Sequence, residues 1–216
     1  MKYPIELLEH YWNFSEFKPQ QEAIIEAVLS NEDCIALLPT GGGKSICFQI
    51  PAMLRKGICI VISPLVALMH DQVNNLNSKG IKSMALTSGF SHSDLDRMLD
   101  NCIFGNYKFL YLSPERLQQD LVQQRIKQMN VNLIAVDEAH CISQWGHDFR
   151  PAYRDIKLLR KIHPTVNVIG LTASATSKVV DDISDQLDCI SPKIFKTSFE
   201  RSNLAYLNLE CHDKLK

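Results

Sequence analysis

The sequence of 216 residues predicts an α/β fold in which a mostly parallel β-sheet carries helices on both faces. Three observations predict it. Short apolar runs alternate with longer segments of helical periodicity along most of the chain. A glycine-rich turn joins the first of these runs to a segment with helical character. Acidic residues directly follow a later run, at the strand end where parallel sheets carry their functional loops.

Two amphipathic helices are predicted ahead of the sheet, because apolar residues recur at helical spacing over residues 5–12 and 20–29. Beyond them, apolar runs of strand length predict buried strands at residues 34–38, 57–62, 83–86, 109–112, 133–136 and 166–171. Two further short strands are predicted near residues 194–195 and over residues 204–209.

Helices are predicted between the strands, at residues 46–50, 65–76, 91–102, 114–129 (in one or two pieces), 153–162 and 177–187. Pro51 is expected to end or kink the first of them at about Ile50, because proline lacks an N–H group and disfavours helical backbone in the preceding residue. Ser91 and Asp94 form a capping-box pattern that predicts a helix start.

Composition narrows the class of protein. Lysine and arginine number 23 against 24 acidic residues, a net charge of −1, which argues against a surface coated in positive charge but leaves room for a local basic groove. No apolar run is long enough to span a membrane, so no membrane partner is expected. The 7 cysteines are scattered, without a Cys-x-x-Cys pair, and predict buried reduced thiols in a cytoplasmic protein.

The sequence LPTGGGKS at residues 38–45 follows the first strand and opens a helix, the context of a phosphate-binding loop. Glycines allow the backbone N–H groups to turn inward toward an anion, and the helix N-terminus adds partial positive charge. Leu38 stands where the usual pattern has its first glycine. The predicted nucleotide contacts are Thr40, Gly41, Gly42, Gly43, Lys44 and Ser45, with Lys44 on the β- and γ-phosphates and Ser45 on Mg²⁺.

An acidic box, Asp-Glu-Ala-His, directly follows the strand predicted at residues 133–136. A phosphate-loop enzyme needs a carboxylate at such a strand end to hold magnesium, and Asp137 is expected to do so. Glu138 is expected to orient and deprotonate the attacking water, and His140 to sense the γ-phosphate or to link the site to a neighbouring one.

Together the phosphate loop and the acidic box resemble the first motor domain of superfamily 2 helicases, a RecA-like P-loop NTPase fold. The sequence CISQWGHDFRP at residues 141–151 is similar to the aromatic-rich loop of RecQ-type DNA helicases. The resemblance runs from about residue 14 to residue 203. It implies N-terminal helices at 1–30 packed on an ATP-binding domain at 31–203, with 204–216 starting the connection to a second motor domain.

In the family that this chain resembles, the aromatic-rich loop couples single-stranded DNA binding to ATP hydrolysis. Trp145 and Phe149 offer flat faces to unstacked bases, although a core position is the alternative for Trp145. Its polar and small neighbours favour an exposed loop. The implied DNA contacts are Ser63, Pro64 and Leu65, which resemble motif Ia, and Ser143, Gln144, Trp145, His147, Phe149 and Arg150.

The sequence FKPQQ at residues 17–21 resembles the family's adenine-reading motif. Gln21 can pair with an adenine edge through its amide, and Phe14 and Lys18 stand where the family stacks an aromatic ring and a cation on the base. Lysine replaces the more usual arginine and stacks less well, so adenine selectivity is expected to be looser. The alternative is a solvated loop with one buried phenylalanine.

Three further segments resemble helicase motifs. Thr172 and Ser174, in the sequence LTASA, resemble motif III, which connects hydrolysis to DNA. The sequence SPER at residues 113–116 resembles a strand-contact motif but is equally an ordinary helix start. Residues 198–203 resemble the exit from the first motor domain.

The resemblance implies an ATP- and Mg²⁺-dependent 3′→5′ DNA helicase acting on single-stranded and partly duplex DNA in repair and recombination, at the nucleoid of a bacterial cytoplasm. The family closes a second RecA-like domain, with an arginine finger, over the ATP. The 216 residues alone are therefore expected to be monomeric, to hydrolyse ATP slowly and not to unwind DNA. Two alternatives are another phosphate-loop enzyme, such as a kinase or GTPase, and a non-catalytic nucleic-acid-binding module of P-loop fold.

Overall fold

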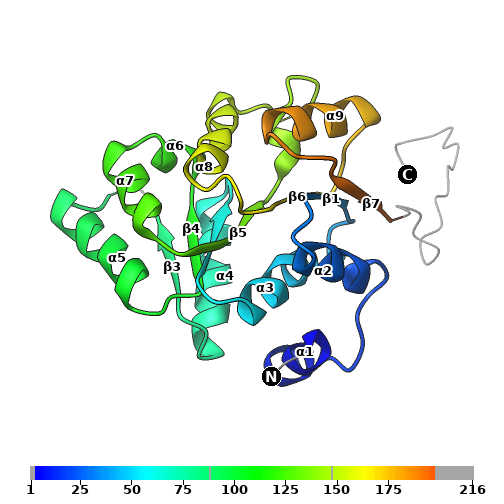
Figure 1. Ribbon diagram of the computed structural model, residues 1–216, viewed down its shortest axis with the longest axis horizontal. Helices are drawn as coiled ribbons and strands as arrows, with labels where there is room; N and C mark the ends of the chain where they lie inside the picture. Colours follow the sequence, from blue (N-terminus) through cyan, green and yellow to red (C-terminus); the bar gives the residue numbers. More distant parts are fainter. Residues whose placement is uncertain (1–2, 88, 147, 198–216) are drawn as a thin grey trace, which may run out of the picture.

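The computed structural model describes residues 3–87, 89–146 and 148–197, and these form a parallel β-sheet flanked by helices (Figure 1). The sheet has 7 strands in the order β3-β4-β2-β5-β6-β1-β7, and every pair is parallel. The predicted α/β class with a parallel sheet is confirmed. The strands are β1 Cys34–Leu37, β2 Ile58–Ile62, β3 Ser83–Leu86, β4 Phe109–Leu112, β5 Val131–Val136, β6 Val168–Thr172 and β7 Lys193–Lys196.

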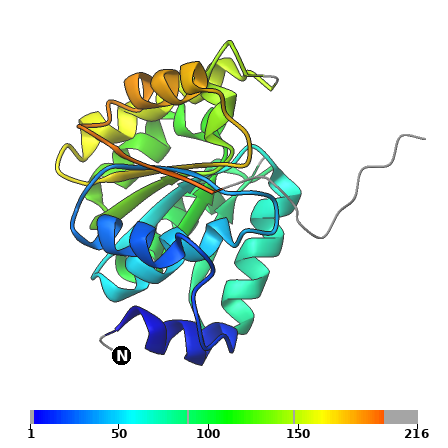
Figure 2. The ribbon, with the colours of Figure 1, turned by 90° about the vertical axis from the view of Figure 1, so that its right-hand side faces the viewer.

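Helices cover both faces of the sheet, as the view along its edge shows (Figure 2). One face packs against α2 Gln21–Leu29, α3 Lys44–Leu54 and α4 Val66–Ser78, and α1 Pro4–Trp12 lies outside α3. The other face packs against α5 His92–Phe104, α6 Pro114–Leu117, α7 Asp120–Gln128, α8 Lys157–Ile162 and α9 Ser177–Gln186. The 3₁₀ turns η1 Ala139–Ile142 and η2 Pro151–Ile156 connect β5 to α8.

The central strands are apolar throughout because both of their faces are covered. Along β2, Cys59 and Val61 point to the core under α2, α3 and α4, whereas Ile60 and Ile62 point to the core under α5 to α9. All five residues of β2 are buried. A strand that alternates between two cores has no polar face, which is why a continuous apolar run predicted it.

Of the two outcomes predicted for Pro51, an end of the helix at Ile50 is wrong, because α3 continues through Pro51 to Leu54. Met53 and Leu54 pack against the apolar cluster around α1, and Arg55 N donates to the Pro51 carbonyl. This packing outweighs the local preference against helix before proline. Other boundaries differ less: the helix predicted at residues 114–129 is α6 and α7, and that at residues 153–162 is η2 followed by α8.

Cysteine side chains lie in the two cores, as predicted: Cys34, Cys47, Cys59, Cys102 and Cys141 are buried free thiols, and Cys189 is half-buried. Burial raises the pKa of Cys47 and Cys102 to about 12, which keeps these thiols protonated. The strand predicted at residues 204–209 lies outside the described residues. Among the described helices, none combines the length and the apolar character that crossing a membrane requires.

The order of the strands brings three loops together. Since all strands are parallel, their carboxyl ends lie along one edge of the sheet. β6 lies between β5 and β1, so the loop after β6 separates the loops that carry the acidic box and the phosphate loop. Segments about a hundred residues apart in the sequence thereby become neighbours.

Candidate active site

The phosphate loop curls between β1 and α3 by means of glycines in left-handed backbone conformations. Gly41 has a φ of +78° and Gly43, which directly precedes α3, has a φ of +75°. A Cβ atom at Gly43 would lie 2.3 Å from Gln21 Nε2, so a side chain here would displace the Gln21 amide as well as strain the left-handed backbone. Gly42 N donates to the Pro39 carbonyl at 2.8 Å, which completes the turn. Thr40 is exposed, and Ser45 is half-buried in the first turn of α3.

The residues of the adenine-reading motif lie against this loop. Lys18 Nζ donates to the Gly41 carbonyl at 2.7 Å, and Gln21 Nε2 donates to the Gly43 carbonyl at 3.0 Å. Gln21 Oε1 accepts from Lys18 N at 2.9 Å, so the Gln21 amide that was predicted to read adenine is engaged within the protein. Phe14 is 54% exposed and lines, with Lys18, Gln21 and Gly43, a pocket of about 410 Å³.

The acidic box and the phosphate loop meet at the carboxyl edge of the sheet. Glu138 Oε1 lies 3.8 Å from Lys44 Nζ, although the two residues come from different strand ends. Glu138 has a φ of +47°, a left-handed conformation that costs a non-glycine residue free energy. Burial, with the neighbouring Glu138 carboxylate, raises the pKa of Asp137 to about 6. The Asp137 carboxylate accepts from Glu138 N at 3.0 Å.

His140 joins the acidic box to the segment that resembles motif III. Its Nδ1 atom lies 2.9 Å from Thr172 Oγ1 and 3.3 Å from Glu138 Oε2, and the side chain is buried. Thr172 Oγ1 donates in turn to the Ser174 carbonyl at 3.2 Å. The predicted coupling residues therefore form a continuous polar chain from Glu138 to Ser174.

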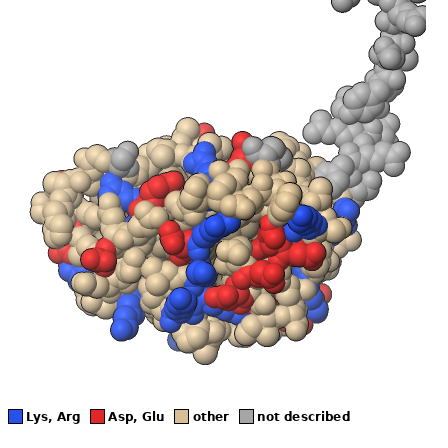
Figure 3. Space-filling model, turned by 90° about the horizontal axis from the view of Figure 1, so that it is seen from above, with Lys and Arg blue, Asp and Glu red and all other residues tan. Residues whose placement is uncertain are grey.

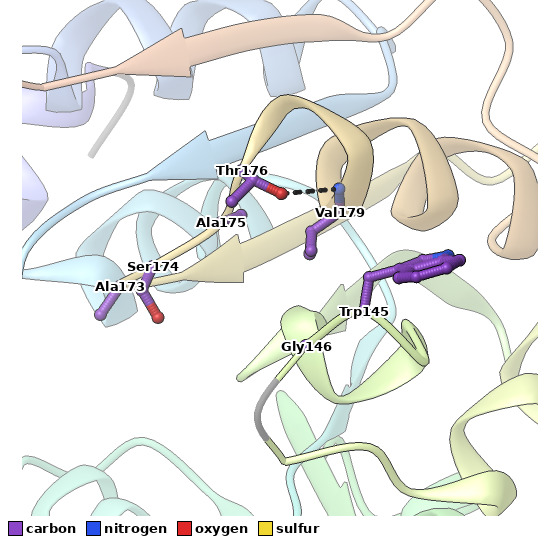
Figure 4. A pocket seen from close by; sticks show the side chains of 7 residues that line it. All are labelled: Trp145, Gly146, Ala173, Ser174, Ala175, Thr176 and Val179. Carbon is purple, nitrogen blue, oxygen red and sulfur yellow. Dashed lines mark hydrogen bonds between the residues drawn. The ribbon is translucent and has the colours of Figure 1, made fainter.

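The predicted aromatic-rich loop leaves β5 through η1 and displays its tryptophan on the surface. Trp145 is 65% exposed, so the alternative of a core position is excluded. Trp145 lines a pocket of about 330 Å³ with Gly146, Val179 and the segment Ala173–Thr176 (Figure 4). Phe149 is half-buried beneath the Arg154 guanidinium, at 5.1 Å from the ring centre. Gln144 is exposed, and His147 lies outside the described residues.

The segment that resembles motif Ia lies beside this loop. Arg150 Nη1 donates to the Pro64 carbonyl at 3.1 Å and so connects the two predicted DNA-contacting segments. Leu65 is 49% exposed, but the Ser63 side chain is only 1% exposed and its hydroxyl has no hydrogen-bond partner among the described residues. Leu65 is thus open to a ligand here, whereas the predicted Ser63 contact would need the side chain to turn outward.

A comparison with known protein families identifies the class of the chain. Residues 18–183 match the DEAD/DEAH box helicase family. The chain belongs to that family. It is 43% identical over 202 residues to the ATP-dependent DNA helicase RecQ of Bacillus subtilis (strain 168), covering 93% of this chain and 34% of the relative. It is 42% identical over 207 residues to the putative ATP-dependent DNA helicase Q1 of Caenorhabditis elegans, covering 93% and 33%.

This helicase domain therefore spans about a third of the length of these curated relatives. Solved structures agree on the fold. The Pyrococcus furiosus Hef helicase domain matches 90% of this chain and 39% of its own with a TM-score of 0.65 at 23% identity. The DUF1998 helicase MrfA bound to DNA and AMPPNP matches 91% of this chain and 29% of its own with a TM-score of 0.72 at 16% identity. These likenesses confirm the RecA-like helicase fold.

The donor set of this helicase domain fits a magnesium–nucleotide complex. In the described part of the chain, no group of three or more His, Cys, Asp and Glu side chains could hold a metal by itself. Ser45 and Asp137 instead offer one hydroxyl and one carboxylate, both hard oxygen ligands. Mg²⁺ typically takes few protein ligands and completes its octahedron with water and phosphate oxygens, so this sparse set suits it.

Three contacts in the site escaped the sequence analysis. Tyr153 is buried, and its hydroxyl donates to the Asp137 carbonyl at 3.0 Å. Asp182 and Lys178, both on α9, contact the aromatic-rich loop at Ser143 and Trp145. Nothing in the sequence indicated Tyr153, which reads as an ordinary apolar position. For α9, the sequence pattern predicts a helix but does not indicate which loop its polar residues contact.

Charge on the upper face of the domain is mixed. Figure 3 shows lysine and arginine side chains interleaved with acidic ones across this face. Within the segment resembling a strand-contact motif, the Arg116 guanidinium donates to the Thr87 carbonyl and so has a structural use. Lysine and arginine side chains are therefore not gathered into one positive field on this face.

Proposed function

We propose that this domain is the ATP-binding motor of a RecQ-like 3′→5′ DNA helicase, which binds Mg²⁺–ATP and single-stranded DNA. In the longer helicase, hydrolysis would drive duplex unwinding. The observation that carries the proposal is the meeting of Lys44 with Glu138, in a box that runs directly into the loop displaying Trp145. The nucleotide site and the DNA site would therefore share one short segment.

The phosphate loop would hold the nucleotide. Its backbone N–H groups and Lys44 would bind the phosphates, and Ser45 and Asp137 would hold the magnesium ion. The bound ion neutralises charge on the β- and γ-phosphates during transfer. The pocket of about 410 Å³ lined by Phe14 and Gln21 lies beside the loop and would receive the base. For adenine to be read by Gln21, its amide would have to exchange its contact with the Gly43 carbonyl for the base.

Glu138 would act as the general base. A γ-phosphate at the loop competes for the Lys44 ammonium, which now lies 3.8 Å from the Glu138 carboxylate. Glu138 would then be free to orient a water molecule and to accept its proton. Loss of this pairing would also change the field at His140 Nδ1, 3.3 Å from Glu138 Oε2, and so affect the chain of contacts through Thr172.

Single-stranded DNA would cross the carboxyl edge between the motif Ia segment and the aromatic-rich loop. Trp145 would stack on a base, an interaction worth roughly 1–3 kcal/mol. Arg150, anchored on the Pro64 carbonyl, would connect the two DNA-contacting segments. In the family, a second motor domain supplies an arginine finger worth about 10³–10⁵ in turnover. The 216 residues tested alone should accordingly hydrolyse ATP slowly.

The test is the fluorescence of Trp145 in a Trp12→Phe background, since the chain has only 2 tryptophans. A single-stranded oligonucleotide is titrated with and without magnesium and a non-hydrolysable ATP analogue. We expect a quench whose midpoint shifts with nucleotide. The same titration with a GTP analogue separates this proposal from a GTPase. A signal that responds to neither ligand would contradict both binding assignments.

A further inference from the structure

Two side chains of α9 hold the aromatic-rich loop. Asp182 Oδ2 accepts from Ser143 Oγ at 2.5 Å, and Lys178 Nζ lies 3.1 Å from the centre of the Trp145 ring. Residues four apart lie on the same face of a helix, so both contacts come from one face of α9. The contact between Ser143 and Asp182 joins residues that are 39 positions apart in the sequence.

The two contacts fix different parts of the loop. Ser143 Oγ donates to Asp182 and accepts from Trp145 N at 3.1 Å, so the carboxylate fixes the backbone at the tryptophan. The Lys178 ammonium lies over the ring and fixes the indole itself. Because Trp145 is 65% exposed, packing against the core contributes little to its orientation. Without α9, an exposed indole would sample several rotamers.

The held ring forms one wall of a slot. The pocket of about 330 Å³ next to Trp145 is lined on the other side by the segment Ala173–Thr176 and by Val179 at the start of α9 (Figure 4). These are small side chains, which leave space beside the indole. Thr176 caps the helix by accepting from Val179 N at 3.4 Å, which keeps this wall in place. The slot therefore lies between the aromatic-rich loop and the motif III segment.

We propose that Lys178 and Asp182 are positioning residues for single-stranded DNA, because they hold Trp145 as one wall of a slot for an unstacked base. This inference rests on the proposed DNA-binding function. Fixing the ring before the base arrives removes part of the ordering cost of binding. Lys178 makes the ring a fixed partner and adds a positive charge near the strand, whereas Asp182 adds a negative charge and can favour DNA only through its hold on Ser143.

The negative charge of Asp182 and its contact with Ser143 should have opposite effects on DNA affinity, so substitution of Asp182 tests the proposal. Asp182→Ala removes a negative charge near a polyanion, so electrostatics alone would tighten binding, whereas loss of positioning weakens it. Asp181→Ala is the matched control, because Asp181 is exposed on the same helix and its side chain makes no hydrogen bond or ion pair within the described residues. Affinity for fluorescently labelled oligo(dT) is measured by anisotropy at fixed salt.

We expect Asp182→Ala to weaken oligo(dT) binding about threefold to tenfold, while Asp181→Ala binds as well as the parent or better. Asp182→Asn keeps an oxygen acceptor for Ser143 and should restore most of the affinity. Lys178→Met should weaken binding and Lys178→Arg should retain it, since a guanidinium also stacks on indole. Equal or tighter binding by Asp182→Ala would overturn the proposal, as would full affinity of Lys178→Met.

A second measurement separates this inference from the proposed function. In the Trp12→Phe background without ligand, Asp182→Ala and Lys178→Met should each change the emission and near-UV circular dichroism of Trp145. Unchanged spectra would overturn the hold of α9 on the loop, whatever the DNA affinity. Changed spectra, in a chain that binds no oligo(dT) at all, would overturn the proposed function and with it the DNA role of Lys178 and Asp182.

Discussion

The amino and carboxyl edges of the sheet differ in how completely their polar groups are satisfied within the protein. At the amino edge, Asp33 precedes β1 and its side chain is 3% exposed, yet every oxygen is used. Its carboxylate accepts from Arg160 Nη2 at 2.6 Å, from Val168 N at 2.8 Å and from Ile190 N at 2.7 Å. The group ties β1, β6, α8 and the segment before β7 together. Its polar atoms are satisfied within the fold.

The carboxyl edge shows the opposite. Glu138 has left-handed backbone, the buried Ser63 hydroxyl has no hydrogen-bond partner in the described part of the chain, and Trp145 is exposed. Asp137 is half-buried beside Glu138, with its pKa raised to about 6. Strain and like-charge proximity reduce stability unless a ligand relieves them. We infer that the amino edge contributes more to the stability of this domain, whereas polar groups at the carboxyl edge are left available to ligands.

The strongest test of the comparison is Glu138→Gln. Glutamine keeps the size of the side chain but cannot accept a proton, so ATP turnover should fall about 10²–10⁴-fold. The free energy of unfolding should change little, because glutamine can keep an oxygen 3.3 Å from His140 Nδ1 and loses only the 3.8 Å ion pair with Lys44. Turnover is measured as single-turnover phosphate release, and stability by urea denaturation.

The control for this variant is Glu115→Gln, at the exposed start of α6, which should leave both quantities unchanged. Binding of a fluorescent ATP analogue to Glu138→Gln should stay within a few-fold of the parent. Turnover at the parent's rate would refute the role of Glu138 as general base, whereas a parent that hydrolyses no ATP would favour the non-catalytic alternative.

Asp33→Ala is expected to have the opposite effect, lowering stability without changing nucleotide affinity. This variant leaves the Arg160 guanidinium and two backbone N–H groups without their buried acceptor, which should cost about 3–5 kcal/mol of unfolding free energy. Affinity for Mg²⁺–ATP, measured where the variant is folded, should not change. Asp33→Ala combined with Arg160→Met should recover part of the loss, since no charge is then left unpaired. A loss below about 1 kcal/mol would show that the amino edge is not where stability resides.

Sequence patterns predicted the fold well where one local signal decides the structure. The strands β3 and β4 lie at their predicted residues because short apolar runs bounded by polar turns permit few alternatives. The helix through Pro51 was missed because its continuation depends on Met53 and Leu54 packing against α1, a contact that no local pattern contains. Whether the proposed domain limits at residues 30 and 203 hold stays a prediction.

In the site, sequence reasoning found the groups with chemistry and missed those that orient them. Lys44, Glu138 and Trp145 stand out because their residue types match a reaction or a ligand. Tyr153 and Asp182 act by contacts across 16 and 39 residues of sequence, and such contacts depend on the arrangement of the elements. The burial of Ser63 was missed for the same reason.

A smaller effect should appear with pH at Asp137, in metal-free buffer with a chelator. Its pKa rises from 3.8 to about 6 on folding, mainly because burial penalises the carboxylate. The folded state therefore binds the proton more tightly than the unfolded state. The resulting stabilisation is present below about pH 4 and is lost as pH rises through about 6, by on the order of 2–3 kcal/mol.

Asp137→Asn should remove this pH dependence. The variant should gain stability relative to the parent between pH 5 and pH 8 in urea denaturation, while losing Mg²⁺-dependent nucleotide binding. Such a gain would show that the carboxyl edge gives up stability to keep a carboxylate for a ligand. Parallel stability curves for parent and variant across this pH range would refute the raised pKa and that part of the comparison.

The smallest predicted effect concerns Tyr153, which is buried like the amino-edge groups but supports the carboxyl edge. Tyr153→Phe removes the 3.0 Å hydrogen bond to the Asp137 carbonyl while keeping the ring in the core. We expect a loss of about 1 kcal/mol in stability and a few-fold loss of turnover, because the peptide between Asp137 and Glu138 loses a fixed contact. Tyr107→Phe is the matched control, since the Tyr107 hydroxyl makes no hydrogen bond within the described residues. If Tyr153→Phe lowers stability but leaves turnover at the control's level, the Tyr153 hydroxyl stabilises the fold and does not support the chemistry at the carboxyl edge.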